Sequence, residues 1–406
     1  YFFYLKEIER NLNTLDIIGL NPNRKDEINK KYIEAAKYPG GVRSFIKHAL
    51  VKNLAISGLD KAVELNKAID FMILQSFSYG MEPKDGKYSN KLHSLVIGPP
   101  AVGKKLLTKI ALILNPVAYE LPSTPNKLTM AGLVGNVVRG KGKTTSNPGY
   151  LPKASGGIIC IQDFHEYISG GGKSSNLFST LSKLMEDGEV IDSTMARTTH
   201  KAITAIHFDM NRLSQVMPNK TFHGHEDIGI KTNILSRFDF ILEIPRNDEI
   251  QMQVADQIID SWKDYGNYMS INESTPNWIR DLKIIVAHHT SNFSNPEFDS
   301  AVEDYIHLKK AQFRDTYSLK MTGCYHLSDF EIRLTNSLKK FVEAIACSRS
   351  FSTVRKEFVD EAFSFIKHKF DFLVSIETSP FKRDKASDRR EMIVTQFNNR
   401  EVKKSE

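Results

Sequence analysis

The sequence has few cysteines and no long apolar run, and both shortages exclude whole classes of protein. It holds three cysteines in 406 residues, Cys160, Cys324 and Cys347. An odd number spread this widely excludes a disulfide-stapled scaffold and favours a reducing intracellular compartment, either a nucleus or a prokaryotic cytoplasm. No stretch of about 18 apolar residues occurs, so we expect no membrane-spanning helix. The chain starts at Tyr1 without a secretory pattern, and we interpret it as a fragment of a longer protein.

Charge is plentiful but only mildly biased towards the positive sign. Lys and Arg number 55 and Asp and Glu 48, which gives a net charge of +7 and a pI of about 9.0. This excess permits nucleic acid as a partner without establishing it. Hydrophobic residues make up 41% of the chain, which excludes disorder as the dominant state. The Cys-x-x-Cys pairs that typify zinc sites are missing, so we predict no metal centre of that kind.

The order of patterns along the chain predicts an α/β fold followed by a helical lid. Four short β-rich runs separated by helical patterns lie between 51 and 247, at 92–97, 157–161, 201–208 and 238–244. That alternation is typical of an αβα sandwich. From 248 to 373 apolar residues recur every three or four positions, which predicts a helical bundle. We expect a linker or helical segment at 1–50, and a charged tail at 374–406 with a helix at 388–398.

A glycine-rich segment after the first predicted strand matches the phosphate-loop pattern G-x-x-x-x-G-K, and an amphipathic run follows it. Glycines let the backbone curl so that its N–H groups face phosphate oxygens, and the dipole of the following helix adds to the attraction. Lys104 would contact the terminal phosphates as a point charge. We therefore predict an ATP-binding loop made of Gly98, Pro99, Pro100, Ala101, Val102, Gly103, Lys104 and Lys105.

Two positions depart from the usual metal-binding chemistry of such loops. The residue after the loop lysine is normally Ser or Thr, whose hydroxyl binds Mg²⁺, but here it is Lys105, and a cation cannot ligate a cation. The strand GGIICIQDFHE at 156–166 resembles the minichromosome-maintenance (MCM) branch of AAA+ helicases. That family places an aspartate that helps to hold Mg²⁺, and a glutamate that orients the attacking water, where this chain has Gln162 and Asp163. The resemblance thus implies ATP as the cofactor and leaves Mg²⁺ open.

The resemblance covers about residues 55–370 and implies further site residues. The motif LSRFD matches the arginine finger of the family, which implies that Arg237 acts on the nucleotide of a neighbouring subunit. Asn211 corresponds to the sensor-one asparagine, with Asp209 as the alternative if the preceding strand ends earlier. Arg333 lies in a segment similar to the sensor-two helix.

Two basic segments are similar to the loops that contact DNA phosphates in the central channel of the resembled family. One is RGKGKTTSNP at 139–148, and the other is STMARTTHK at 193–201, which we interpret as the tip of a hairpin. The resemblance implies DNA contacts by Arg139, Lys141, Lys143, Arg197 and Lys201.

The resemblance implies an ATP-dependent DNA helicase motor, or a subunit of one, in a homo- or heteromeric ring that is hexameric by analogy. Lys104, Asp163 and Asn211 would act within the subunit, and Arg237 and Arg333 from the next one. An alternative is a degenerate, hydrolysis-poor subunit that binds DNA or completes another subunit's site, because two Mg²⁺ ligands are replaced at once, at Lys105 and Gln162. A third reading, a protein-remodelling AAA+ ATPase, would leave the two basic segments without a role.

Overall fold

The computed structural model describes residues 25–378, apart from gaps at 55, 57–61, 79–90, 122–128, 141–142, 170–173, 193–197, 218–219, 221, 223, 249–276, 292–295 and 322–324. Residues 379–406, with the helix expected at 388–398, lie outside the described part. No helix within that part is long and apolar enough to cross a membrane.

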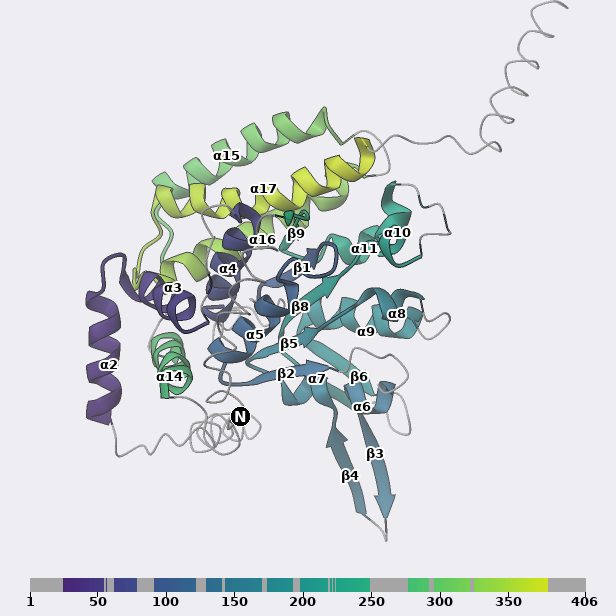
Figure 1. The fold of residues 1–406 in the computed structure, drawn as a ribbon, viewed down its shortest axis with the longest axis horizontal. Helices are drawn as coiled ribbons and strands as arrows, with labels where there is room; N and C mark the ends of the chain where they lie inside the picture. Colours follow the sequence, from purple (N-terminus) through teal and green to yellow (C-terminus); the bar gives the residue numbers. More distant parts are fainter. Residues whose placement is uncertain are drawn as a thin grey trace, which may run out of the picture.

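A five-stranded parallel sheet forms the centre of the molecule (Figure 1). Every residue of β1, β5 and β8 is buried, as expected for strands covered on both faces. The sheet and its flanking helices confirm the predicted α/β class. In spatial order the strands are β2 (Ala118–Leu121), β5 (Ile158–Ile161), β8 (Ala205–Met210), β1 (His93–Ile97) and β9 (Phe240–Glu243).

Helices flank this sheet on two sides in Figure 1, with α4 and α5 towards one side and α8, α9 and α11 towards the other. Helix α5 begins directly after the glycine-rich loop, and its buried Leu107, Ile110, Ala111 and Leu114 follow the helical period that faces a core. The flanking helices are α4 (Val63–Ser76), α5 (Lys104–Leu114), α8 (His165–Ser169), α9 (Ser174–Asp187), α10 (Leu213–Val216), α11 (Thr232–Leu235) and the 3₁₀ turn η3 (Gly224–Asp227).

The C-terminal part is helical, in agreement with the period seen in the sequence. Its last helix extends to Thr378, past the boundary predicted at 373. The elements are α14 (Asn277–Ser291), α15 (Ser300–Ser318), the 3₁₀ turn η4 (Leu327–Phe330), α16 (Glu331–Ser348) and α17 (Lys356–Thr378).

Two helices precede the sheet, α2 (Lys25–Lys37) and α3 (Gly41–Asn53). Gly40, with a φ of 86°, forms the turn between them. Val42, Ile46 and Leu50 of α3 are buried. Residues 25–37 and 41–53 are thus helical.

Two antiparallel hairpins extend the core, and both correct the sequence interpretation. The segment 139–148, expected as a flexible loop, belongs to the hairpin of β3 (Gly135–Gly140) and β4 (Lys143–Pro148), which projects from the body in Figure 1. The glycines and polar residues of this segment lack the alternation of apolar and polar residues that marks strands, so the sequence gives no signal for a hairpin here. The helices α6 (Met130–Val134) and α7 (Tyr150–Lys153) flank this hairpin.

The second hairpin, β6 (Glu189–Asp192) with β7 (Thr198–Lys201), shows that the strand predicted at 201–208 had the wrong bounds. Lys201 ends β7 opposite Glu189, and the core strand β8 starts only at Ala205. The backbone N–H of Ala202 donates to the Gly188 carbonyl and closes the hairpin there. Lys201 therefore lies at the base of this hairpin and not at its tip.

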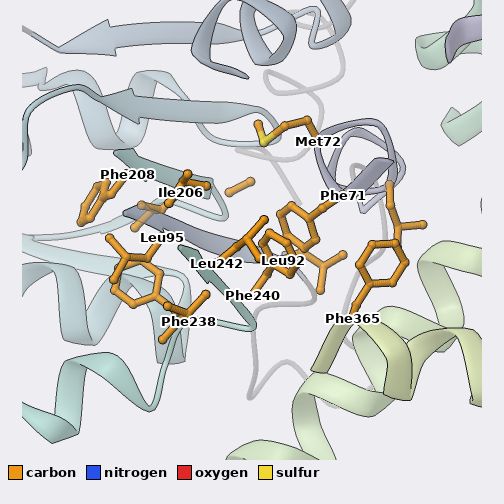
Figure 2. Close-up of a cluster of buried hydrophobic side chains, with 14 of the residues drawn as sticks. Phe71, Met72, Leu92, Leu95, Ile206, Phe208, Phe238, Phe240, Leu242 and Phe365 are labelled. Carbon is orange, nitrogen blue, oxygen red and sulfur yellow. The ribbon is translucent and has the colours of Figure 1, made fainter. Parts of the chain in front are cut away.

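An aromatic cluster joins the lid to the sheet. The rings of Phe71 from α4 and Phe240 from β9 stack with centroids 4.3 Å apart. Phe365 of α17 contacts both rings at 6.2 and 6.1 Å. Figure 2 shows Phe365 pointing from its helix towards this pair. Helix α17 is thus anchored against the edge strand β9.

Candidate functional site

The glycine-rich loop joins the end of β1 to the start of α5, and its backbone has room only for glycine at the critical points. A Cβ on Gly98 would lie 2.6 Å from the carbonyl oxygen of Ile244. Gly103 precedes α5 with a φ of 93°, in the left-handed region that favours glycine. The N–H of Leu106 donates to the carbonyl oxygen of Gly103 at 3.0 Å. The N–H groups before it lie where a helix supplies no intrahelical acceptor, as a phosphate-binding loop requires.

Lys104 folds back over this loop. Its ammonium donates to the carbonyl oxygens of Gly98 at 2.6 Å and Pro99 at 2.8 Å, and to Oδ1 of Asn211 at 2.7 Å. These bonds use all three protons of the ammonium. The structure therefore brings together the loop lysine and the predicted sensor asparagine, which follows β8. A bound phosphate would have to replace at least one of the three acceptors.

Asp209, the alternative sensor in the sequence, is a buried carboxylate beside the loop. It is 3% exposed and accepts from the backbone N–H of Asp163 at 3.1 Å and from the hydroxyl of Thr108 at 3.4 Å. Burial raises its pKa from 3.8 to about 6, although the bond from Asp163 and the charge of Lys104 oppose the shift. Burial likewise lowers the pKa of Lys104, with Asp209 and Asp163 opposing. The loop lysine thus faces an acid supplied by the neighbouring strand.

The raised pKa of Asp209 predicts that Asp209→Asn stabilises the fold at neutral pH. Because the folded pKa of about 6 exceeds the unfolded 3.8, folding favours the protonated acid, and its contribution to stability is lost as pH rises from 3.8 through 6. The full difference corresponds to about 3 kcal/mol at pH 7. An amide is neutral and keeps an acceptor for the Asp163 N–H.

Denaturant unfolding between pH 4 and 7.5 measures this effect. The variant should gain up to about 3 kcal/mol over the parent at pH 7, and the gain should vanish towards pH 4. A variant that is less stable at pH 7 would mean that Lys104 stabilises an ionised Asp209 more than burial penalises it.

The residues at the usual metal-ligand positions do not fit Mg²⁺. Lys105 is exposed at the start of α5 and offers an ammonium where a hydroxyl is needed. Gln162 follows β5 with a neutral amide, a weaker ligand for a hard cation than a carboxylate. The buried acid Asp209 already accepts bonds from Asp163 and Thr108. Among the residues that the structure describes, no group of three His, Cys, Asp or Glu side chains could hold a metal ion.

Arg237 and Arg333 converge on one carboxylate. Glu186, near the end of α9, accepts from Nη2 of Arg237 at 2.5 Å and from Nη2 of Arg333, on α16, at 2.6 Å. The three side chains line a pocket with Asp239 and Lys340. Burial raises the pKa of Glu186, but the bonds from the two arginines outweigh it and lower the pKa below its ordinary value.

This arginine pair and the glycine-rich loop lie at opposite ends of the parallel strands. Arg237 precedes β9, whereas the loop follows β1, and the two strands run parallel with Ser94 beside Phe240. Ile244, which neighbours Gly98, lies four residues beyond Phe240, or about 13 Å along the strand. With its guanidinium held by Glu186, Arg237 points away from the loop of its own chain.

The predicted DNA-contacting cations are distributed over both hairpins. Arg139 and Lys143 belong to β3 and β4, where Gly140 pairs with Lys143 next to the turn. Lys141 and Arg197 lie outside the described residues, in the segments that connect the strands of each hairpin. Lys201 is exposed at the base of its hairpin, opposite Glu189, and not at the predicted tip.

Three residues of the candidate site were not predicted from the sequence. Thr108 lies one helical turn after Lys104, a spacing that could have signalled it. Glu186 follows Met185 in a stretch that resembles the family, but its pairing with Arg333 spans 147 positions. Arg212 follows Asn211 and ties it to β9 through a two-point bond to Glu243, with both distances 2.6 Å. No local pattern in the sequence predicts these last two pairings.

Comparison with known proteins agrees with this geometry. The family model described as the MCM P-loop domain matches residues 43–262, more than half of the chain. A search of curated proteins finds no match. An MCM P-loop domain implies nucleotide binding in general, and proteins of this family typically act on DNA in multi-subunit rings. The chain therefore belongs to the MCM family of AAA+ P-loop ATPases.

Proposed function

We propose that the chain is a motor subunit of an MCM-like DNA helicase ring, with ATP bound between adjacent subunits. One observation carries the proposal: the glycine-rich loop and the arginine pair lie at opposite ends of the strands of one sheet. A subunit built in this way offers a phosphate-binding loop to one neighbour and two guanidinium groups to the other. Sites shared in this manner make each interface heterologous, which gives a ring where the rotation between subunits closes and an open filament where it does not. The multi-subunit rings typical of the family favour the closed form.

Within the subunit, Lys104 would bind the terminal phosphates, Asn211 would orient them and Asp163 would hold the attacking water. The close approach of Lys104 to Asn211, at 2.7 Å, supports this grouping. Arg237 and Arg333 would stabilise the charge that develops on the phosphoryl group bound to the neighbouring subunit. Replacing Arg237 by alanine and measuring hydrolysis in the assembly tests the proposal.

A second candidate is a hydrolysis-poor subunit that completes its neighbour's site while its own site turns over slowly. The exposed ammonium of Lys105 and the amide of Gln162, at two metal-ligand positions, favour it. The arginine pair fits both candidates, because it would serve only the adjacent site. The two candidates therefore differ in the role of the glycine-rich loop of this chain and agree on the role of the arginine pair.

We further propose that both hairpins bind DNA through phosphate contacts with little sequence preference. The position of Arg139 and Lys143 next to the turn of a projecting hairpin supports this role. Phosphate contacts position a protein on DNA but carry no base information. Lys201 is left out of this set because it lies at the base of its hairpin.

Replacing Arg139, Lys141, Lys143 and Arg197 by alanine should weaken DNA binding and flatten its dependence on salt. For every phosphate that is no longer neutralised, the slope of log K against log salt should fall by about 0.9 on duplex DNA, or about 0.7 on a single strand. Fluorescence anisotropy at several salt concentrations measures the slope, with Lys201→Ala as the matched control. An unchanged slope would remove the hairpins from the DNA interface.

A further inference from the structure

The finger residue Arg237 is flanked by two backbone carbonyls that share one buried donor. Lys369 of α17 is 1% exposed, and its ammonium donates to the carbonyl oxygen of Ser236 at 2.9 Å and to that of Phe238 at 2.6 Å. These are the residues directly before and after Arg237. A lid helix thus holds the backbone on both sides of the finger.

The aromatic anchor of α17 explains how Lys369 reaches this position. Lys369 lies one helical turn after Phe365, so both side chains share the face that packs on the sheet. Phe365 contacts Phe71 and Phe240 (Figure 2). Burial lowers the pKa of Lys369 to about 7, with the carboxylate of Asp239 opposing the shift. Burying a charged ammonium costs free energy, and the two hydrogen bonds to the backbone offset that cost. An apolar side chain at this position would pack on the sheet but could not make these bonds.

The residue at the end of the finger motif is held by the other lid helix. Asp239 accepts from the hydroxyl of Ser337 at 2.6 Å and from the ammonium of Lys340 at 3.3 Å, both on α16. It also accepts from the backbone N–H of His93 in β1, at 2.8 Å. Helices α16 and α17 therefore fix the segment 236–239 between them.

We propose that Lys369 is a positioning residue for the finger: through the carbonyls of Ser236 and Phe238 it sets where Arg237 projects, so the finger follows the lid of its own subunit. Arg333 comes from α16 of the same lid and shares Glu186 with Arg237. A shift of the lid would then carry both arginines together towards or away from the neighbouring nucleotide. The inference rests on the finger role proposed for Arg237.

Backbone hydrogen exchange in the 406-residue chain tests the positioning directly. The amides of Arg237, Phe238 and Asp239 donate to Ile234, Leu235 and His93 respectively, so their exchange reports on how firmly the segment is held. Lys369→Met removes both bonds of the ammonium and should raise the exchange rates of these amides by at least about tenfold, which corresponds to about one net hydrogen bond. Lys369→Arg, which keeps the donors, should restore part of the protection. Lys367→Met removes an exposed lysine of the same helix and should change nothing.

Lys369→Gln provides a milder variant should the methionine variant fail to fold, because its amide still supplies N–H donors. The glutamine amide lies one atom closer to the backbone and carries no charge, so it should raise exchange at Arg237, Phe238 and Asp239 by less than methionine does. Unchanged exchange at these amides in folded Lys369→Met, or in Lys369→Gln where the methionine variant does not fold, would overturn the inference. In an assembly that hydrolyses ATP, Lys369→Met should lower kcat about tenfold and leave KM for ATP unchanged, and Lys369→Arg should recover part of the loss.

If Arg237→Ala leaves hydrolysis intact, the finger role fails, whereas the exchange measurement still decides whether Lys369 holds the segment. If Arg237→Ala abolishes hydrolysis and Lys369→Met leaves kcat intact, only the positioning inference fails.

Discussion

Arg237→Ala is expected to reduce ATP hydrolysis by about 10³–10⁵ in any assembly of this chain that hydrolyses ATP, with little change in the nucleotide affinity of a single subunit. A guanidinium supplied by a neighbour stabilises charge that develops only in the transition state, so its loss lowers kcat and not ground-state binding. The separation of Arg237 from the glycine-rich loop of its own chain is the structural reason for expecting intact affinity.

A mixing experiment separates action between subunits from a general defect. Arg237→Ala subunits keep the loop, and Lys104→Met subunits keep the finger, so a mixed assembly can form interfaces with both intact. Partial recovery of hydrolysis on mixing is expected. Arg246→Ala serves as the control, because Arg246 follows β9 on the surface, is 68% exposed and pairs with nearby Asp248. Parental hydrolysis by the Arg237 variant would show that the finger assignment is wrong.

Much of the fold could be predicted because its signals are local. Strands β1, β5 and β9 lie within a residue or two of the predicted runs, since buried parallel strands leave apolar stretches bounded by turn residues. Strand β2 was missed because it is a four-residue edge strand with only one buried residue, Leu121. The β3–β4 hairpin was not predicted because the sequences of its two strands, GNVVRG and KTTSNP, lack the apolar–polar alternation that marks strands.

The candidate site was predictable only where one motif contains the interacting residues or a family resemblance links them. Lys104 and Asn211 were grouped by resemblance, and their side chains meet. The position of the Asp209 carboxylate beside the loop depends on the register between β5 and β8. Ile161, the last residue of β5, pairs with Phe208, so Asp209 lies one residue past the end of β5. Lys369 touches residues more than 130 positions away in the chain, and nothing near it in the sequence indicates that contact.

Parental ATP binding is expected to tolerate excess EDTA. Relative to the usual loop, Lys105 adds one positive charge and Gln162 removes one negative charge, so the site changes by (+1) + (+1) = +2, which equals the charge of Mg²⁺. Ammonium groups can offset phosphate repulsion, at about 4 kcal/mol for a 4 Å pair at an effective dielectric of 20. Water screens the exposed Lys105 more than it screens Lys104, which is buried. Calorimetric titration of ATP with and without EDTA measures the tolerance.

Restoring the family residues should convert this site into one that requires Mg²⁺. The double variant Lys105→Thr with Gln162→Asp should make ATP binding sensitive to EDTA, because it returns a hydroxyl and a carboxylate to the ligand positions.

Adding Asp163→Glu should raise hydrolysis by about 10²–10⁴, the contribution typical of a positioned general base. The backbone at Asp163 has a φ of 51°, which aspartate tolerates better than glutamate, so the triple variant should lose some stability. Thermal melting of the double and triple variants separates that cost from the catalytic gain. Fast Mg²⁺-dependent hydrolysis by the parent, or collapse of its ATP binding in EDTA, would refute the hydrolysis-poor alternative, since the metal would then be held without the usual ligands.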